Sequence, residues 1–337
     1  MFNFDEKHYL EVCNNACGLR KEVENLADKL SKKGFENLFF IASGGSLAVT
    51  QTFEYIWKNK SKIPVYSEIA AEIVLTDNKQ LTENSLVILQ SKSGDTKETV
   101  AAARYLKERG ITTVGIVRVE GSPLDKACDY SIIETVENFA GSDPENIVLY
   151  YLLFRLLYNN GEFEQYNKFA DEVSLIPEAM VDVRKQSDSF AHDFAEKYKD
   201  EPYQLWIGAG SLFGKTYSYA MCVLEEMQWI KSKSIQAAEY FHGTLEIVEK
   251  DTCVVSIKGE DECRVLSERV ERFTEKYTDK FTVIDTKDYI VKGLSDEFRV
   301  IVGQLIVTAV VDRISVYLEK MRNHSLDIRR YYRVLEY

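Results

Sequence analysis

The sequence predicts an α/β protein with two doubly wound parallel-sheet domains in tandem. Short β-branched runs alternate with longer amphipathic segments along the chain, a pattern typical of parallel strands joined by helical crossovers. A length of 337 residues suits two domains of about 150 residues each. The strand–turn junctions at 39–47 and 205–212 also resemble each other weakly, which suggests a structural duplication.

The first half of the chain is expected to supply five strands and the helices between them. An opening helix is expected over about 5–33, and Pro144 marks the first turn of a helix over 143–158. Turns at 43–46 and 91–96 each open a helix, and these helices end near 58 and 109. The expected strands are 37–42, 64–67, 85–90, 112–118 and 130–133.

The second half repeats this cycle. Two helical stretches within 162–199 lead to strands at 203–208, 253–258 and 281–285, with helices over 215–227 and 297–320. We therefore expect a first domain over 1–160, a second over 161–323 and a C-terminal tail over 324–337. The chain has only five prolines and no Gly/Ser tract, so the domains are expected to pack closely instead of hanging on a flexible linker.

Composition argues against several classes of function. The net charge is −12 and no half of the chain is basic, which disfavours a nucleic-acid binder. The longest apolar runs contain Arg155 and Gln304 and are too short for a membrane span, and the N-terminus lacks a signal-peptide pattern. The six cysteines form neither a C-x-x-C pair nor a zinc-binding spacing. We expect a cytoplasmic protein with reduced cysteines, no metal, and no nucleic-acid or membrane partner.

Two hydroxyl-rich turns follow strands and precede helices, which is where open parallel sheets bind ligands. They are Ser43-Gly44-Gly45-Ser46 and Ser91-Lys92-Ser93-Gly94-Asp95-Thr96. Hydroxyls and backbone amides suit a phosphate monoester, although one serine or glycine before a helix is also ordinary capping chemistry. The second turn supplies three hydroxyls where a cap needs one. No Walker motif occurs, and 208–214 has one residue too many for G-x-G-x-x-G, so a nucleotide site is poorly supported.

A carboxylate and an imidazole in the second half form a candidate proton-transfer pair. Glu226 lies sixteen residues before His242, one of only four histidines, and Gly243 follows the histidine. Such a pair, brought together by a loop, can move protons on and off a carbon and an oxygen of one small substrate. A solvated acidic helix face is the alternative for Glu226. Glu239 could orient His242 or bind a substrate amine, or it could simply favour a helix start.

The chain resembles the sugar isomerase (SIS) family over nearly its whole length. The resemblance rests on the two hydroxyl-rich turns, on the paired α/β halves and on the spacing from Glu226 to His242. It implies that the first domain binds a phosphosugar, with the phosphate held by Ser46, Ser91, Ser93 and Thr96. Lys92 would then contribute its backbone more than its charge. The resemblance also implies that the glutamate moves a proton between C1 and C2, while the histidine assists as an acid or in ring opening.

Within this family the chain is most similar to the fructosamine-6-phosphate deglycases. Segments 224–230, 238–243 and 329–337 carry that similarity. The glucosamine-synthesising relatives have a cysteine after the initiator methionine, where this chain has Phe2, and a C-terminal lysine near the position of Arg333. Arginine cannot form the Schiff base available to lysine, because its guanidinium stays protonated. The chain departs from many relatives at Thr244, where they have proline.

The resemblance implies a reaction on a phosphosugar–amino acid conjugate. With Glu226 as base and His242 as acid, a fructosamine 6-phosphate would pass through an enaminol to a C1 imine. Water would then release glucose 6-phosphate and a free amino acid. Glu239 and Arg333 would help to bind the substrate, the tail would fold over the site, and no cofactor is implied. A homodimer or higher homo-oligomer is implied, in which His242 could act in a neighbour's site.

Three other functions stay open at this point. The same scaffold could host a deglycase for 2-amino-aldose 6-phosphates such as glucoselysine 6-phosphate, or an aldose–ketose or amino-sugar isomerase. The third is a non-catalytic phosphosugar sensor. Such a sensor would normally carry a helix-turn-helix with a basic surface, and the sequence predicts neither. Nothing in the sequence identifies the pocket for the released amino acid.

Overall fold

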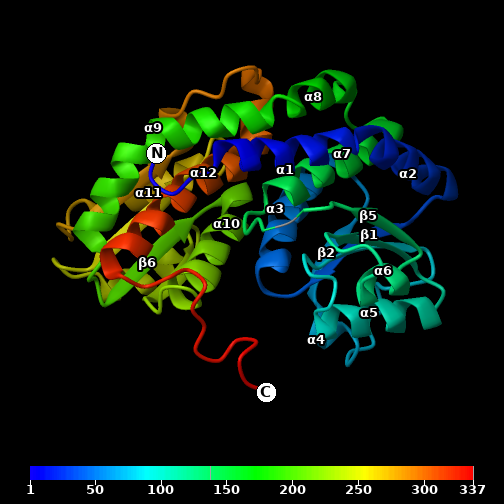
Figure 1. Ribbon diagram of the computed structural model, residues 1–337, viewed down its shortest axis with the longest axis horizontal. Helices are drawn as coiled ribbons and strands as arrows, with labels where there is room; N and C mark the ends of the chain where they lie inside the picture. Colours follow the sequence, from blue (N-terminus) through cyan, green and yellow to red (C-terminus); the bar gives the residue numbers. More distant parts are fainter. Residues whose placement is uncertain (137, 337) are drawn as a thin grey trace. The chain divides into compact units, whose positions relative to one another are not determined.

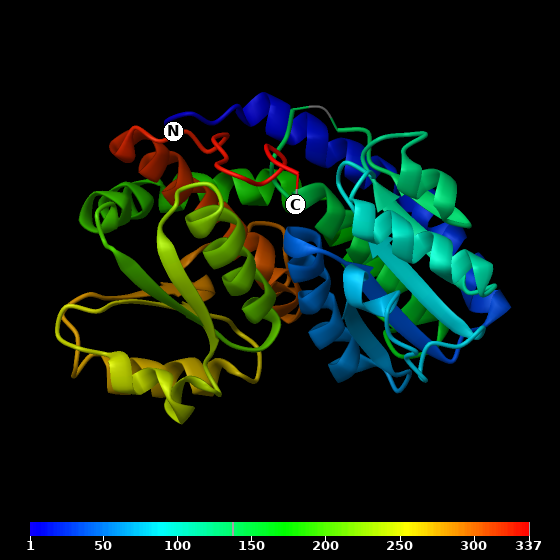
Figure 2. The same ribbon diagram turned by 90° about the horizontal axis from the view of Figure 1, so that it is seen from below.

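The computed structural model describes residues 1–136 and 138–336 and divides into two compact units. One unit is Glu6–Pro177, and the other combines Met1–Asp5 with Glu178–Tyr337. Each unit has its own parallel sheet with helices packed on it (Figure 1, Figure 2). The predicted α/β class with two parallel sheets is therefore confirmed.

The sheet of the Glu6–Pro177 unit has five parallel strands in the order β2-β1-β3-β4-β5. The strands are β1 (Asn37–Ala42), β2 (Val65–Ile69), β3 (Ser85–Gln90), β4 (Thr112–Val117) and β5 (Tyr130–Ile133). The helices are α1 (Glu6–Gly18), α2 (Arg20–Lys33), α3 (Gly44–Lys60), α4 (Ala70–Ile73), α5 (Lys97–Glu108), α6 (Pro123–Ala127), α7 (Asp143–Asn159) and α8 (Tyr166–Val173). In this flavodoxin-like order the strand sequence reverses between β1 and β3, and ligands of such sheets bind beyond the carboxyl ends of the strands at that point.

Helix α7 is the centre of the layer on one face of this sheet. It is buried along most of its length, because α1, α2, α3 and α8 pack around it. The layer on the other face is formed by α4, α5 and α6, which pack on Phe39 and Ile41 of β1 and on Val87 and Leu89 of β3. Figure 1 shows α7 on one side of the strands and α5 and α6 on the other. Both central strands are therefore buried at all six positions, as in parallel sheets covered on two faces.

The other unit has four parallel strands in the order β7-β6-β8-β9. The strands are β6 (Tyr203–Gly208), β7 (Lys231–Gln236), β8 (Cys253–Lys258) and β9 (Phe281–Asp285). The α-helices are α9 (Ile176–Tyr198), α10 (Phe213–Ser218), α11 (Arg264–Thr274) and α12 (Asp296–Arg322). The short segments are η1 (Gly210–Leu212), the π-helix η2 (Tyr219–Glu225), η3 (Tyr240–His242), η4 (Thr244–Ile247) and η5 (Thr286–Asp288). This order repeats that of the first four strands of the other sheet, as a structural duplication would.

Helix α12 is the core helix of its unit. By length and composition it could cross a membrane, but 83% of its most apolar window is buried inside the protein. Within the unit, the Ser315 hydroxyl of α12 donates to the Tyr219 hydroxyl of η2 at 3.3 Å. The apolar composition of α12 thus reflects burial in a folded domain, as in core helices of soluble proteins.

Several elements differ from the expectations drawn from the sequence, which does not predict α4, α6 or α11. The helix expected over 5–33 is two helices, because the chain breaks at Leu19 between α1 and α2. The helix expected over 215–227 begins as α10 and continues as the π-helix η2. The sequence does not predict β7 at all. Its Lys231-Ser-Lys-Ser stretch lies on an exposed sheet edge, where strands lack the apolar pattern by which they are recognised.

The compact units also divide later in the chain than the sequence suggests. The expected boundary is at 160/161, whereas the first unit extends to Pro177. Helix α8 accounts for this difference, because its Phe169 packs on Phe154 of α7 with ring centroids 4.5 Å apart. The N-terminal residues join the other unit, where the Phe2 carbonyl accepts a 2.6 Å hydrogen bond from Arg313 of α12.

Candidate functional site

The two hydroxyl-rich turns emerge side by side at the switch point of the five-stranded sheet. Strands β1 and β3 are paired in parallel with Ile41 opposite Leu89. Continuing that register by two residues places Ser43 opposite Ser91, on strands about 4.8 Å apart. The fold therefore brings together the two turns that the sequence predicts as a phosphate site.

The first turn is the beginning of helix α3. Ser43 has an extended backbone (φ −134°, ψ 149°), and Gly44 has φ +56°, a left-handed value that favours glycine. Gly45 and Ser46 then lie in the first helical turn, so the turn expected at 43–46 is mostly helix. No side chain caps α3, which leaves its first amides as donors for an anion.

The second turn is organised by its own hydroxyl groups. The Ser91 Oγ lies 2.9 Å from the Thr96 Oγ1, and the Gly94 amide donates to the Ser91 carbonyl at 3.1 Å. The Ser93 hydroxyl is hydrogen-bonded to the carboxylate of Asp95. Thr96 precedes helix α5 without capping it through its side chain. The hydroxyls and uncapped amides suit a phosphate monoester, and the phosphate site itself stays a prediction.

The residue after β4 and the helix α6 hold the backbone of this second turn in place. The Lys92 carbonyl accepts from the Arg118 amide at 3.1 Å, and the Gly94 carbonyl accepts from the Leu124 amide at 2.9 Å. The Lys92 ammonium donates to the carbonyls of Ala140 and Gly141 at 2.7 and 2.9 Å. This side chain therefore fastens the segment that follows β5, while its backbone shapes the turn.

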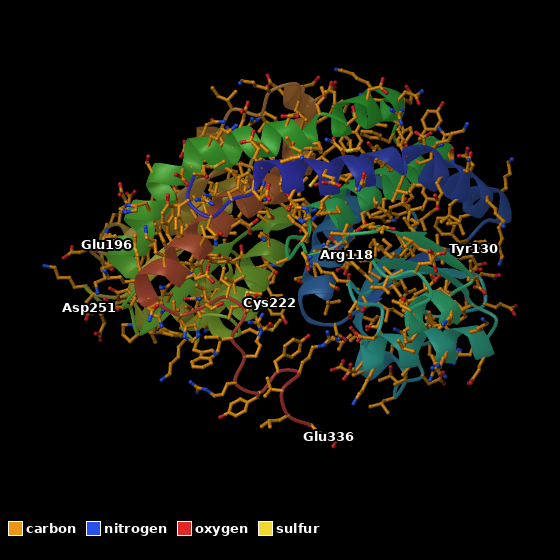
Figure 3. All side chains as sticks on the ribbon, in the orientation of Figure 1. Arg118, Tyr130, Glu196, Cys222, Asp251 and Glu336 are labelled. Atoms are coloured by element: carbon orange, nitrogen blue, oxygen red, sulfur yellow. The ribbon has the colours of Figure 1, made fainter. Side chains whose placement is uncertain are left out.

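A buried charged cluster lies beside the turn and was not predicted from the sequence. Arg118, labelled in Figure 3, forms a 2.7 Å ion pair with Glu145 of α7, and both side chains are buried. Glu134 follows β5, and neither of its buried carboxylate oxygens has a hydrogen-bond partner among the described residues. Burial, reinforced by the negative charge of Glu145, raises the pKa of Glu134 well above its usual range. The position of Glu134 directly after a strand was the only signal available.

Glu226 lies at the end of the π-helix in the other unit. Its amide donates to the Met221 carbonyl, five residues earlier, at 3.0 Å. Such π segments are rare and are frequently found at functional sites. The Glu226 carboxylate accepts a 2.8 Å hydrogen bond from the Arg329 Nε, so the candidate base is ion-paired with the C-terminal tail.

His242 lies in the segment that connects β7 to β8. It closes the short helix η3, and its side chain is exposed. The bond that links it to Glu239 joins backbone atoms, from the His242 amide to the Glu239 carbonyl at 3.0 Å. Gly243 follows with φ +147°, a conformation that favours glycine and sets the exit of the chain from η3.

The four-stranded sheet separates Glu226 from His242 within one chain. Side chains alternate between the two faces of β6. Trp206 packs on Tyr219 of η2 with ring centroids 4.7 Å apart, and η2 ends at Glu225, directly before Glu226. Leu205, the neighbour of Trp206, points to the other face of the sheet, where it belongs to a hydrophobic cluster that contains Tyr240 of η3. The two candidate catalytic residues thus lie on elements that cover opposite faces of the sheet, and a strand, not a loop, connects them.

The second sheet has a similar switch point, between β6 and β8, but a side chain fills it. The Ser211 amide and hydroxyl donate to Asp261 Oδ2 at 2.9 and 2.7 Å, and Asp261 is buried. Gly210 has φ +55°, close to the +56° of Gly44 in the other unit. A Cβ at Gly210 would lie 2.4 Å from the Asp261 carboxylate. This carboxylate occupies the anion position of the 208–214 junction, which agrees with the poor nucleotide motif there.

The tail begins where α12 ends and is fastened to the residues after Glu226. The His324 carbonyl accepts from the Gln228 amide group at 2.8 Å, and the His324 and Trp229 rings are 4.4 Å apart. Arg333 lies farther along in an exposed stretch with φ +57°. Figure 3 labels Glu336 close to the end of this tail, and residue 337 lies outside the described residues. The predicted contribution of Arg333 to substrate binding stays a prediction.

Two of the cysteines are buried in surroundings that suppress thiol chemistry. Burial raises the pKa of Cys128 and of Cys253 to about 12, which keeps both as unreactive thiols. Within residues 1–136 and 138–336, no group of three or more His, Cys, Asp and Glu side chains is placed to hold a metal. The expectation that the reaction uses neither metal nor cofactor stays a prediction.

Comparisons with known proteins add independent evidence. Residues 29–158 match the model of the SIS domain. The chain is 33% identical to the fructosamine deglycase FrlB of Bacillus subtilis (strain 168), over 95% of this chain and 98% of that protein. It is 23% identical to the fructoselysine 6-phosphate deglycase of Escherichia coli (strain K12), over 92% and 89% of the two chains.

Solved structures give the same picture. A crystal structure of a candidate phosphosugar isomerase from Bacillus subtilis superposes with a TM-score of 0.89 at 32% identity, over 94% of this chain and 97% of that one. The C-terminal domain of glucosamine-fructose-6-phosphate aminotransferase from Francisella tularensis has a TM-score of 0.81 at 18% identity, over 96% of each chain. The second likeness concerns the fold alone.

Proposed function

The chain belongs to the SIS domain family, and from that premise we propose that it is a deglycase acting on fructosamine 6-phosphates. The observation that carries the proposal is the 33% identity to a fructosamine deglycase over 95% of the chain. The fructoselysine 6-phosphate deglycase supports the same reaction at 23% identity. The products would be glucose 6-phosphate and a free amino acid.

The paired turns of the five-stranded sheet bind the phosphate of the substrate in this proposal. Ser46, Ser91, Ser93 and Thr96 supply hydroxyls, and α3 and α5 begin there without side-chain caps. An anion at two helix N-termini gains from both the free amides and the helix dipoles. Because the chain carries a net charge of −12, such local donors are needed to hold a phosphate.

Glu226 acts as the base that moves a proton between C1 and C2. It takes a proton from C1 of the ketoamine, and the electron pair left behind forms the C1=C2 double bond of the enaminol. The C2=O π bond breaks at the same time, and its oxygen takes a proton from the acid. Protonation at C2 and loss of the N–H proton then give a C1 imine, so that C1 is oxidised as C2 is reduced and no external oxidant is needed. Water adds to the imine carbon, and the amine leaves with a proton.

His242 serves as the acid of this reaction from a second copy of the chain. The elements that carry Glu226 and His242 cover opposite faces of one sheet, and this favours a site completed by a neighbour. The protein would therefore work as a homodimer or higher homo-oligomer, in which each histidine loop serves the partner's site. Glu239, exposed three residues before His242, would meet the substrate amine there.

The cellular setting follows from the same chemistry. All six cysteines are free thiols, which suits the reducing cytoplasm. The substrate is a small phosphosugar–amino acid conjugate, and neither a nucleic acid nor a membrane is a partner. Arg333 of the exposed tail would contribute to holding the conjugate.

Sugar-phosphate isomerisation is the second candidate. The solved structure with 32% identity and a TM-score of 0.89 is that of a candidate phosphosugar isomerase, and ketose–aldose isomerisation needs the same transfer of a proton between C1 and C2. The two reactions differ in the C1 substituent, which is nitrogen for the deglycase and oxygen for the isomerase.

The deciding experiment offers purified protein either fructoselysine 6-phosphate or fructose 6-phosphate. A coupled dehydrogenase measures glucose 6-phosphate in both cases, and amino-acid analysis measures lysine in the first. We expect glucose 6-phosphate and lysine in equal amounts from the first substrate and no turnover of the second. Turnover of fructose 6-phosphate alone would favour the isomerase. Fructose 6-phosphate released from glucoselysine 6-phosphate would favour a 2-amino-aldose deglycase.

A further inference from the structure

The candidate base is ion-paired with a residue 103 positions later in the chain. Arg329 Nε donates to Glu226 Oε1 at 2.8 Å. The two side chains are 18% and 26% exposed, so the pair is partly shielded from water. The same guanidinium donates through Nη1 to the carbonyls of Leu326 and Ile328 at 2.6 and 3.0 Å. Arg329 thus joins the carboxylate to a turn of the tail.

Contacts on both sides of Arg329 in the chain hold the tail near Glu226. At the end of α12, the Leu326 amide donates to the Glu319 carboxylate at 3.0 Å. Beyond Arg329, the Arg330 guanidinium lies 4.1 Å from the centre of the Trp229 ring. Trp229 has φ +55°, an unfavourable value for a bulky residue, and such strain is often kept at functional segments. The ion pair between Arg329 and Glu226 is therefore one of several contacts that hold the tail in this position.

A permanent guanidinium partner conflicts with the work of a base. A cation at hydrogen-bond distance favours the carboxylate over the carboxylic acid, but a base must become the acid when it takes a proton. Arginine cannot relieve the conflict by giving up a proton, because it stays charged in proteins. Proton transfer from C1 would therefore be easier beside a cation that, unlike arginine, can give up its own proton as the enaminol forms.

The substrate of the proposed deglycase can replace this partner. A fructosamine carries a secondary amine on C1, which is a cation when protonated and lies next to the carbon that loses its proton. We propose that Arg329 is the counter-ion of Glu226 in the substrate-free chain, and that the C1 ammonium of the substrate takes its place and releases the tail from the base. Arg329 is then a positioning residue. The inference rests on the proposed deglycase function.

The tether itself can be tested without turnover. Limited trypsin digestion, followed by mass spectrometry, reports cleavage after Arg329 and Arg330. Glu226→Gln is expected to speed this cleavage several-fold, because the amide cannot hold the guanidinium as an ion pair. Glu225→Gln is the matched control, since Glu225 is exposed on the same segment and accepts a 3.4 Å hydrogen bond from the Ser232 hydroxyl. Equal cleavage rates in the Glu226→Gln and wild-type proteins would overturn the tether.

Steady-state kinetics with fructoselysine 6-phosphate test whether the substrate ammonium replaces Arg329 at Glu226. The test compares the effect of each variant on KM with its effect on kcat. Removing a competing cation in Arg329→Gln is expected to lower KM about two- to fivefold, the size of a partly exposed ion pair, with kcat reduced less than threefold. Arg329→Lys keeps a cation at this position and should restore the wild-type KM. Arg330→Gln, which changes only the neighbouring contact with Trp229, is the control for a general loosening of the tail.

The outcomes separate the inference from the function on which it rests. If the wild-type protein releases no glucose 6-phosphate, the deglycase assignment fails, and the trypsin comparison still decides whether Glu226 holds the tail. If the wild-type protein turns over but Arg329→Gln raises KM or lowers kcat more than tenfold, the exchange is refuted, because Arg329 then helps the substrate. A fall in KM with both Arg329→Gln and Arg330→Gln would likewise refute it, since the effect would not depend on the ion pair.

Discussion

The Ser91 Oγ lies 2.9 Å from the Thr96 Oγ1, so that one hydroxyl pair spans the turn between β3 and α5. We expect Ser91→Ala to weaken binding of glucose 6-phosphate by about 10- to 100-fold, the loss of about 1.5–3 kcal/mol for a hydrogen bond to a charged group. Isothermal titration calorimetry with glucose 6-phosphate measures the change. Ser131→Ala, on β5 with its hydroxyl toward the Asp125 carbonyl, is the control. Unchanged affinity in Ser91→Ala would remove this turn from the phosphate site.

Gly94 is required by the geometry of the same turn. Its φ of +67° disfavours any side chain, and a Cβ there would lie 2.2 Å from the Ser122 Oγ. We expect Gly94→Ala to lower the free energy of unfolding by about 2–3 kcal/mol, from backbone strain together with overpacking. Urea denaturation measures this loss. The double variant with Ser122→Gly should recover the part due to the clash and keep the part due to φ, and full recovery would contradict the backbone argument.

Sequence alone was sufficient for the turns and insufficient for the relation between Glu226 and His242. The strands before Ser43 and Ser91 are continuous apolar runs, and a hydroxyl motif after such a strand falls at the sheet edge in any doubly wound fold. The sequence between Glu226 and His242 resembles a loop, because the strand β7 within it is polar. Only the strand order places their elements on opposite faces, and strand order is a property of the whole sheet.

Contacts of carboxylates with residues far away in the chain could not be predicted from sequence patterns either. Arg329 and Glu226 are 103 positions apart, and Asp261 reaches the Ser211 amide across 50 positions. Each carboxylate has many arginines or amides in the sequence with which it could pair. The choice among them depends on where helix ends and sheet edges meet after folding, which no local spacing records.

Glu226→Gln tests the assignment of the base. We expect kcat to fall at least 100-fold, since general base catalysis contributes about 10²- to 10⁴-fold, while glucose 6-phosphate affinity stays within about tenfold. The phosphate turns belong to a different sheet, which is why binding should survive. Steady-state kinetics and calorimetry give the two quantities. Normal turnover in Glu226→Gln would mean that the base is another residue.

Mixed oligomers test whether His242 works in a neighbour's site. Glu226→Gln and His242→Ala homodimers should both be inactive. If the two residues of one site come from different chains, co-expression gives mixed dimers in which one site has both residues intact, and activity should return to about a quarter of wild type for random pairing in a twofold dimer. If they come from the same chain, every site in the mixture lacks one residue. The absence of any recovery would then contradict the shared site.

Glu134 should make the protein more stable in mild acid than at alkaline pH. Its pKa is raised in the folded state by burial and by Glu145, so the folded chain holds this proton more tightly than the unfolded chain. Stability therefore falls as the pH rises above about 4.3, the ordinary value for an unfolded glutamate, and continues to fall until the folded group ionises. Glu134→Gln keeps the shape of the neutral acid and removes the titration.

The free energy of unfolding of Glu134→Gln should exceed that of the wild type by an amount that is close to zero at pH 4 and grows toward pH 8. Urea denaturation at pH 4, 6 and 8 measures this difference. Glu120→Gln, an exposed substitution near the end of the same sheet, controls for the loss of one negative charge. A Glu134→Gln variant that is less stable than the wild type at pH 8 would show that Glu134 works as a carboxylate paired with Arg118, not as a buried neutral acid.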